Sequence, residues 1–264
     1  MRFEIITTTQ HLVIFIALIV SAMYLISLSG RVRSFVYKQS YLKKEKLVMI
    51  LFFGFIGVLA SEYGFKLIGV IVNVRDCIAL FAGILGGPAV GIGAGLISGF
   101  YRISGLVWFG WTGTLGCWSA IGCGLSTMGA GFLGAWLSKY KNIKIRKITP
   151  KEIWIVAGIV AIWEVIHLQV IVPLTALLYA VKMCPAVVAK TFGPLATLTA
   201  EKLFFGIEKL FFMKLLFPMV VANVLGILLF LFITRDAIVK REIEVAEREI
   251  IEAELKVKEK GEKF

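Results

Sequence analysis

Long apolar runs separated by short polar stretches dominate the pattern along the chain. A helix needs roughly 20 apolar residues to cross the hydrocarbon core of a bilayer. Runs near that length lie at about 11–29, 47–61, 115–137, 153–179 and 211–233, and two shorter runs lie at about 73–86 and 88–102. With a mean hydropathy of +0.88, the pattern predicts an all-α, polytopic helical membrane protein.

The two shorter apolar runs meet at Gly86, Gly87 and Pro88. Glycine tolerates a turn and proline lacks the amide hydrogen that a helix needs, so this triplet predicts a break between two arms of a tight helical hairpin. Small residues at every fourth position let membrane helices approach closely, which is the main role expected for the glycines here. The glycine line comprises Gly83, Gly87, Gly91, Gly95 and Gly99.

The basic residues, 29 Lys and Arg against 17 Asp and Glu, gather in short loops at 30–46 and 138–152. This distribution is typical of cytoplasmic loops and gives no support to a nucleic-acid partner. An even number of segments separates the two loops. We therefore expect a multi-pass protein of the bacterial inner membrane with its N-terminus outside and its C-terminus in the cytoplasm. Whether the hairpin 73–102 crosses the bilayer fully stays open.

Arg75 and Arg102 lie at the outer ends of the two hairpin arms. A charged side chain at this depth is costly unless it is paired, reaches the interface or contacts a ligand. A local pair with Asp76 or Glu62 is an alternative for Arg75, and reaching the interface is one for Arg102. Because a guanidinium binds a carboxylate through two hydrogen bonds, the hypothesis favoured here is a pocket for a small organic anion.

Polar side chains also interrupt the later apolar runs. Glu164 and His167 stand three residues apart and share one helix face. They suit either a proton-sensitive switch or a hydrogen-bonded clamp to another helix. Asn223 is expected to bond across helices, and Pro173 to kink its span. The four cysteines show no metal-ligand spacing, so buried thiols are expected and neither a metal nor a cofactor is predicted.

The composition changes to charged helix formers from Arg235 onward. Apolar residues recur there at steps of three and four, which predicts a parallel coiled coil and a homodimer. They are Val239, Ile243, Ala246, Ile250, Ala253 and Val257. A solvated juxtamembrane helix is the alternative. The predicted domains are a transmembrane sensor over 1–234 and a cytoplasmic signalling helix over 235–264, with the role of 182–209 left open.

Four stretches in this order resemble the five-transmembrane receptor domain of LytS/YehU-type bacterial sensor histidine kinases. They are "NVRD", "GGPAVGIGAGLISGFYR", "EVIH" and "FPMVVANVLG", and the resemblance covers about residues 45–235. It implies a dimeric sensor of a small extracellular molecule that signals to a cytoplasmic kinase and a response regulator. Members are associated with pyruvate or related nutrients and with control of cell-wall hydrolases.

The resemblance also implies ligand-binding residues. They are Asn73, Arg75, Arg102, Ser119 and the cysteine of the next span, best matched by Cys117. The stretch "WFGWTGTLGC" is longer than the family's usual pattern and lacks its proline.

No catalytic motif accompanies these stretches: neither a phosphate loop nor a histidine-kinase core follows the predicted coiled coil. The expectation is therefore a non-enzymatic chain, either a receptor fragment or a stand-alone protein. The rival hypothesis is the substrate-binding membrane subunit of an energy-coupling-factor-type importer, against which the heptad tail argues. Membrane lipid is an expected partner, whereas ligand identity and oligomer geometry stay open.

Overall fold

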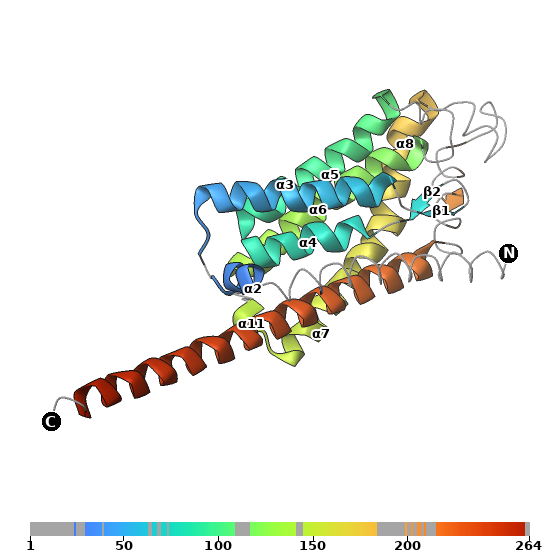
Figure 1. The fold of residues 1–264 in the computed structure, drawn as a ribbon. Helices are drawn as coiled ribbons and strands as arrows, with labels where there is room; N and C mark the ends of the chain where they lie inside the picture. The colour runs from blue at the N-terminus through green and yellow to red at the C-terminus, as the bar shows by residue number, and fades with distance from the viewer. Residues whose placement is uncertain are drawn as a thin grey trace.

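Helices form nearly all of the described structure, which is a computed structural model (Figure 1). It describes residues 24, 30–38, 40–62, 65–67, 70–72, 74–108, 117–140, 145–183, 199, 202, 205–206, 209 and 215–261. The main helices are α2 (Gly30–Tyr37), α3 (Lys43–Glu62), α4 (Arg75–Gly86), α5 (Pro88–Trp108), α6 (Cys117–Tyr140), α7 (Pro150–Ile166), α8 (Val172–Met183) and α11 (Leu216–Gly261). Helices α3 to α6 form a bundle, and α7 and α11 pack against each other beside it.

The all-α class predicted from hydropathy is confirmed. The stretches 119–139, 150–178 and 216–258 are each long and apolar enough to cross a bilayer, and they match three of the predicted spans. The predicted span 11–29 and most of 182–209 lie outside the described residues. One feature was not predicted: two short strands, β1 (Phe65–Leu67) and β2 (Val70–Val72), pair antiparallel between α3 and α4.

The outer surface of the bundle is apolar, as contact with lipid requires. On α3, the exposed apolar side chains include Leu47, Val48, Leu51 and Phe55. Polar side chains such as Ser61, Arg75 and Asn223 are instead buried among the helices. Soluble proteins show the reverse distribution, with polar side chains outside. The difference arises because the hydrocarbon of a bilayer offers a polar group no hydrogen-bond partner.

The predicted hairpin between α4 and α5 is confirmed, and its turn is at Gly87. Gly87 adopts a φ of 81°, a conformation that other residues rarely adopt, and its N–H donates to the Gly83 carbonyl. Pro88 then begins α5, where a helix needs no amide hydrogen. The hairpin directs both arms back along the bundle, so the ends that carry Arg75 and Arg102 lie together, opposite the turn (Figure 1).

Glycines on α5 pack directly against the backbone of α6. A Cβ on Gly131 would lie 2.3 Å from the Gly91 carbonyl oxygen, and one on Gly99 would lie 2.4 Å from the Gly124 carbonyl oxygen. Glycines of the predicted line thus meet glycines of a second line on α6 that the sequence analysis had not singled out. The close contact fixes the positions of α4, α5 and α6, which carry most of the polar side chains described below.

Replacing Gly131 with alanine is expected to destabilise the protein by about 1–3 kcal/mol, because the added methyl group meets main-chain atoms that cannot move aside. Gly158 is the matched control: it is exposed on α7 and nothing lies within 4 Å of an added Cβ. Its replacement should leave stability unchanged or raise it by up to about 1 kcal/mol through helix propensity. Thermal unfolding of both purified variants measures the difference, and equal midpoints would contradict the packing argument.

The span predicted at 153–179 is divided by a π-helical turn, η3 (His167–Ile171), between α7 and α8. Helix α7 begins with a full capping box: the Thr149 side chain accepts from the Glu152 backbone N–H, and the Glu152 side chain accepts from the Thr149 backbone N–H. Pro150 occupies the first helical position. The Val172 N–H donates to the His167 carbonyl, five residues earlier. Pro173, which has no N–H to donate, follows immediately. The expected disruption near Pro173 therefore takes the form of a wide turn that begins at His167 itself.

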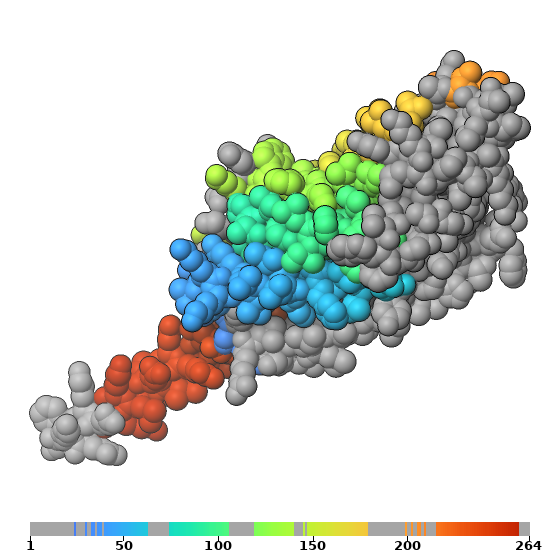
Figure 2. Space-filling view, turned by 90° about the horizontal axis from the view of Figure 1, so that it is seen from above, coloured from blue at the N-terminus to red at the C-terminus, as the bar shows by residue number. Residues whose placement is uncertain are grey.

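Helix α11 runs without a break from Leu216 to Gly261, through the predicted domain boundary at 234/235. Beyond the bundle it extends as a single rod (Figure 2). Ala237 and Ile238 are still buried, and Glu244 bonds Arg33 of α2. From Ile243 onward the predicted heptad positions are exposed. A membrane-embedded helix and the tail are thus one mechanical unit.

Candidate functional site

The two arginines singled out from the sequence both lie inside the bundle. Arg75 begins α4 and is 1% exposed, whereas Arg102 lies near the end of α5 and is fully buried. Arg102 therefore does not reach the interface, which rules out that alternative. Each guanidinium lies within electrostatic range of the other, so the fold brings two like charges together out of water.

Different groups compensate the positive charges of the two arginines. Arg75 Nη1 donates to Ser61 Oγ over 3.1 Å and interacts electrostatically with Asp76 and Glu164. Arg102 lies near Arg75 and interacts with the Cys123 thiol and, electrostatically, with the Glu62 carboxylate. Glu62, the other expected local partner of Arg75, accepts instead from Tyr101 Oη over 2.7 Å. The buried carboxylates thus balance the charge mainly on the Arg75 side.

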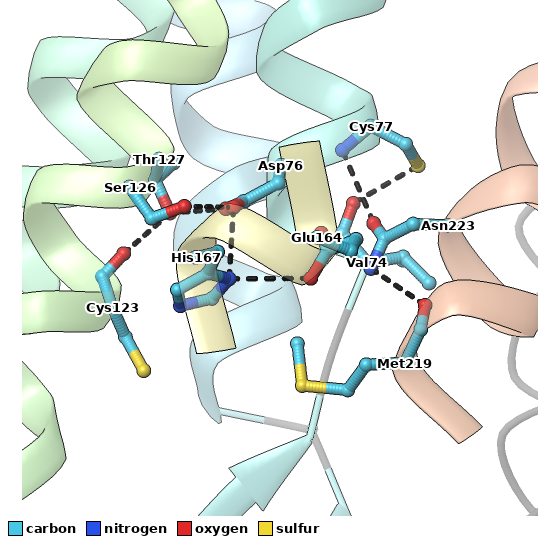
Figure 3. A network of polar contacts seen from close by, with 10 residues as sticks. All are labelled: Val74, Asp76, Cys77, Cys123, Ser126, Thr127, Glu164, His167, Met219 and Asn223. Carbon is cyan, nitrogen blue, oxygen red and sulfur yellow. Dashed lines mark hydrogen bonds and ion pairs between the residues drawn. The ribbon is translucent and has the colours of Figure 1, made fainter. Parts of the chain in front are cut away.

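Asp76 is the centre of a buried polar network (Figure 3). One carboxylate oxygen accepts from Ser126 Oγ over 2.5 Å and the other from Thr127 Oγ1 over 2.6 Å. These hydroxyls come from α6, so Asp76 joins α4 to α6. The side chain is 4% exposed. Such a carboxylate is fully desolvated, and its hydrogen bonds and ion pairs must replace the lost water.

His167 links the network to the span at 150–178, which α7, η3 and α8 form. Its Nδ1 lies 3.2 Å from Glu164 Oε2 and 3.3 Å from Asp76 Oδ2. The imidazole therefore faces one carboxylate on its own helix and one on α4, and the Cys123 side chain of α6 also interacts with the ring. This geometry is the interhelical clamp, one of the two alternatives for Glu164 and His167. The proton-sensitive switch stays a prediction, since the clamp does not exclude it.

Asn223 connects the output helix to the start of α4. Its Oδ1 accepts from the Cys77 backbone N–H over 3.2 Å, and its Nδ2 donates to the Met219 carbonyl over 3.1 Å. Val74, the residue before α4, provides no side-chain cap. An amide from α11 thus satisfies a backbone donor in the first turn of α4. The packing is close, because a Cβ on the neighbouring Gly226 would lie 2.9 Å from Cys77 Sγ.

Asp76, Glu164 and His167 are the described side chains that could hold a metal ion, with ligand atoms within 4.8 Å of one another. Their surroundings favour a different use. Both oxygens of Asp76 already accept hydroxyl protons, and the Arg75 charge acts on both carboxylates. A cation would have to displace the hydroxyl bonds and approach a fixed positive charge, so the charge pattern suits an anion better.

Three predicted ligand residues remain without a defined role. Ser119 is buried on α6. Cys117 begins α6, but its side chain lies outside the described part of the structure, as does all of Asn73. Cys123, one and a half turns further along α6, is the described cysteine that interacts with both arginines and His167. The family resemblance had favoured Cys117, and the sequence analysis gave Cys123 only the role of a buried thiol.

Sequence reasoning missed most of the network. Asp76 was considered only as a local partner of Arg75, and Ser61, Ser126 and Thr127 were not considered. One signal was present: Ser126 and Thr127 are adjacent hydroxyl residues inside an apolar run. Serine and threonine are common in membrane helices and bond their own backbone, as Thr127 also does with the Cys123 carbonyl. Their pairing with Asp76 therefore depends on the tertiary structure.

Comparison with known proteins gives one family. Residues 29–200 match the family described as 5TMR of 5TMR-LYT. The sensor histidine kinase YpdA of Escherichia coli (strain K12) is 30% identical over 126 residues, covering 48% of this chain and 20% of that protein. The sensor protein LytS of Bacillus cereus and that of Bacillus anthracis are each 28% identical over 195 residues, covering 67% of this chain and 31% of those proteins. No solved structure matches the chain. The chain thus spans less than a third of the length of these relatives.

Proposed function

Because the chain belongs to the 5TMR-LYT family of membrane receptor domains, we propose that it is the sensor of a bacterial two-component system and that it binds a small carboxylate. Pyruvate or a related acid is the proposed ligand. One observation carries this proposal: two arginines with almost no exposed surface lie within electrostatic range of each other in the bundle. Such a pair is costly to maintain unless an anion uses it.

The proposed ligand site lies between Arg75 and Arg102, with Cys123 of α6 beside it. Arg75 is oriented by Ser61 and the carboxylates, and Arg102 interacts with Cys123 and with the charge of Glu62, so both guanidinium groups are held in place for a ligand. Arg75, Arg102 and His167 share the buried carboxylates Asp76 and Glu164, and Glu62 acts on Arg102 from an exposed position. A monocarboxylate between the two arginines would add a negative charge to the buried part of this network. Asn73, Cys117 and Ser119 remain proposed contributors to the same site.

The proposed signal path runs from Arg75 to the tail. Arg75 and Asp76 form the first turn of α4, and Asn223 of α11 bonds the next residue in that turn. A ligand that moves or tightens this turn acts directly on α11, which continues as one helix to Gly261. A ligand shifts such an equilibrium only if it binds one arrangement better than the other. The output would pass to a cytoplasmic kinase and a response regulator.

The proposed output state is a homodimer joined by the tail in the cytoplasm. The heptad residues from Ile243 onward are exposed on an otherwise charged helix, which suits a parallel pairing of two copies. In this arrangement the arginines lie toward the outside of the inner membrane and the N-terminus is also outside. Arg75 begins α4, and this end of α4 lies at the opposite end of the bundle from the tail of α11 (Figure 1), which supports that assignment.

Binding and uptake assays together test the proposal. Titration calorimetry of the purified protein with pyruvate, lactate and acetate should give saturable heat for a short 2-oxo acid and little heat for pyruvamide, its uncharged amide. Vesicles that contain the protein should bind labelled ligand without accumulating it. Accumulation that requires an added ATPase module would favour the importer hypothesis, and absence of binding to any carboxylate would contradict the proposed ligand class.

A further inference from the structure

A cavity of about 370 Å³ lies at the opposite end of the bundle from the arginines. It lies where the turn at Gly87, the loop before α3, the end of α6 and helix α11 meet (Figure 1). Its volume is within the range of small-ligand sites. Neither the proposed ligand site nor the signal path from Arg75 uses this cavity.

All described charged side chains that line the cavity are positively charged. Lys38, Lys46 and Lys139 line it, and no carboxylate occurs among the described lining residues. Lys46 is half-buried in the wall, and its ammonium group makes no hydrogen bond or ion pair within the described part of the chain. Lys38 bonds Glu45 over 2.7 Å, an exposed contact outside the lining. The cavity therefore offers net positive charge to an anion.

Polar donors accompany the lysines. Tyr41 also lines the cavity, and its partial burial, followed by the nearby Glu45 carboxylate, raises the pKa of the Tyr41 phenol to about 12. A tyrosine hydroxyl is protonated at neutral pH at its ordinary pKa already, so the Tyr41 hydroxyl is a hydrogen-bond donor in the cavity wall. Pro88 begins α5 at the cavity wall, so the partial positive charge of that helix N-terminus adds to the lysines. A tetrahedral anion with several acceptor oxygens matches this combination.

The surroundings favour a lipid over a free anion. Leu42 and Leu47 flank Tyr41 and Lys46 in the chain and are 71% and 55% exposed. Further along α3, Leu51 and Phe55 continue an exposed apolar surface. An amphipathic molecule can place a phosphate among the lysines and its acyl chains along α3. Basic cavities between membrane helices at the cytoplasmic side are a known form of anionic headgroup recognition.

We propose that this cavity binds the phosphate headgroup of an anionic phospholipid, such as phosphatidylglycerol, with Lys46, Lys139 and Lys38 as its charged contacts. Ile238 of α11 forms part of the wall, so an occupied cavity braces the output helix against the hairpin turn. Lys38 also lines a neighbouring cavity of about 590 Å³ with Arg33 and Arg241. The bound lipid would thereby stabilise the contact of α2 with α11.

Lipid retention tests this proposal. The full chain is reconstituted in equal amounts of phosphatidylglycerol and phosphatidylcholine, purified in a neutral detergent, and its co-purified lipid is quantified by mass spectrometry. Wild type should retain phosphatidylglycerol preferentially. In the double variant Lys46→Gln/Lys139→Gln, the ratio of retained phosphatidylglycerol to phosphatidylcholine should fall about five-fold for each lysine removed. The control Lys43→Gln/Lys44→Gln removes the same charge from exposed positions of α3 outside the cavity and should retain the preference.

Each other outcome overturns the assignment. Equal loss in both double variants would mean that surface charge alone attracts the lipid. Unchanged retention in Lys46→Gln/Lys139→Gln would exclude the cavity. If glycerol 3-phosphate or inorganic phosphate raises the unfolding midpoint through the same lysines while lipid is not retained, the occupant is a soluble phosphate. Unfolding midpoints in phosphatidylcholine establish that both variants fold.

Discussion

Replacement of Arg102 with methionine is expected to weaken binding of a short carboxylate by about 30-fold or more while leaving the fold intact. The loss follows from the removal of a desolvated, charge-assisted contact, which typically costs 2–5 kcal/mol. Stability should be maintained or increased, because Arg102 is fully buried next to the like charge of Arg75, and an apolar side chain of similar size removes that repulsion. Calorimetry with pyruvate and thermal unfolding measure the two effects on the same samples.

Two further variants separate charge from geometry at this position. Arg102→Lys keeps the charge but loses the planar pair of donors, so it should bind with an intermediate affinity. Arg248→Met removes the same charge from an exposed position on the tail and should bind as wild type does. If Arg102→Met retained full affinity, the buried arginine pair would have a structural role only, and the ligand would have to bind elsewhere.

The hairpin shows how much local chemistry can predict. Gly86, Gly87 and Pro88 fix a turn through properties of single residues, a positive φ and a missing amide hydrogen. Once the turn is known, chain geometry alone requires that the far ends of its arms meet. The proximity of Arg75 and Arg102 could therefore be predicted without knowledge of any other helix. The same holds for Glu164 and His167, whose shared face depends only on the helical repeat.

The remaining site residues depend on helix packing that no local pattern encodes. Asp76 of α4 meets Ser126 and Thr127 of α6 because Gly83 and Gly134 let these two helices approach closely. Only the first glycine line was recognised. The π-helical turn at His167 also rotates later residues, which a constant helical repeat cannot anticipate.

Asp76 is the residue whose loss should affect stability most. Its carboxylate accepts from hydroxyls on α6, faces His167 of η3 and balances the charge of Arg75. Removing it leaves these groups buried without their shared acceptor. A buried ion pair that loses one partner typically costs 3–5 kcal/mol, because the remaining charge keeps its desolvation penalty. We expect a loss of about that size for Asp76→Ala.

The control for this expectation is Asp236→Ala, since Asp236 also forms an ion pair, with Lys240, but its side chain is 48% exposed. An exposed pair contributes about 0–1 kcal/mol, so the two variants should differ by at least about 2 kcal/mol in free energy of unfolding, measured in mixed micelles. Asp76→Asn retains an acceptor oxygen and should lie between them if the acceptor and the charge both contribute. If it matches Asp76→Ala, the charge dominates, because only the carboxylate balances Arg75. Equal stabilities of Asp76→Ala and Asp236→Ala would instead show that the network does not hold α4, α6 and η3 together.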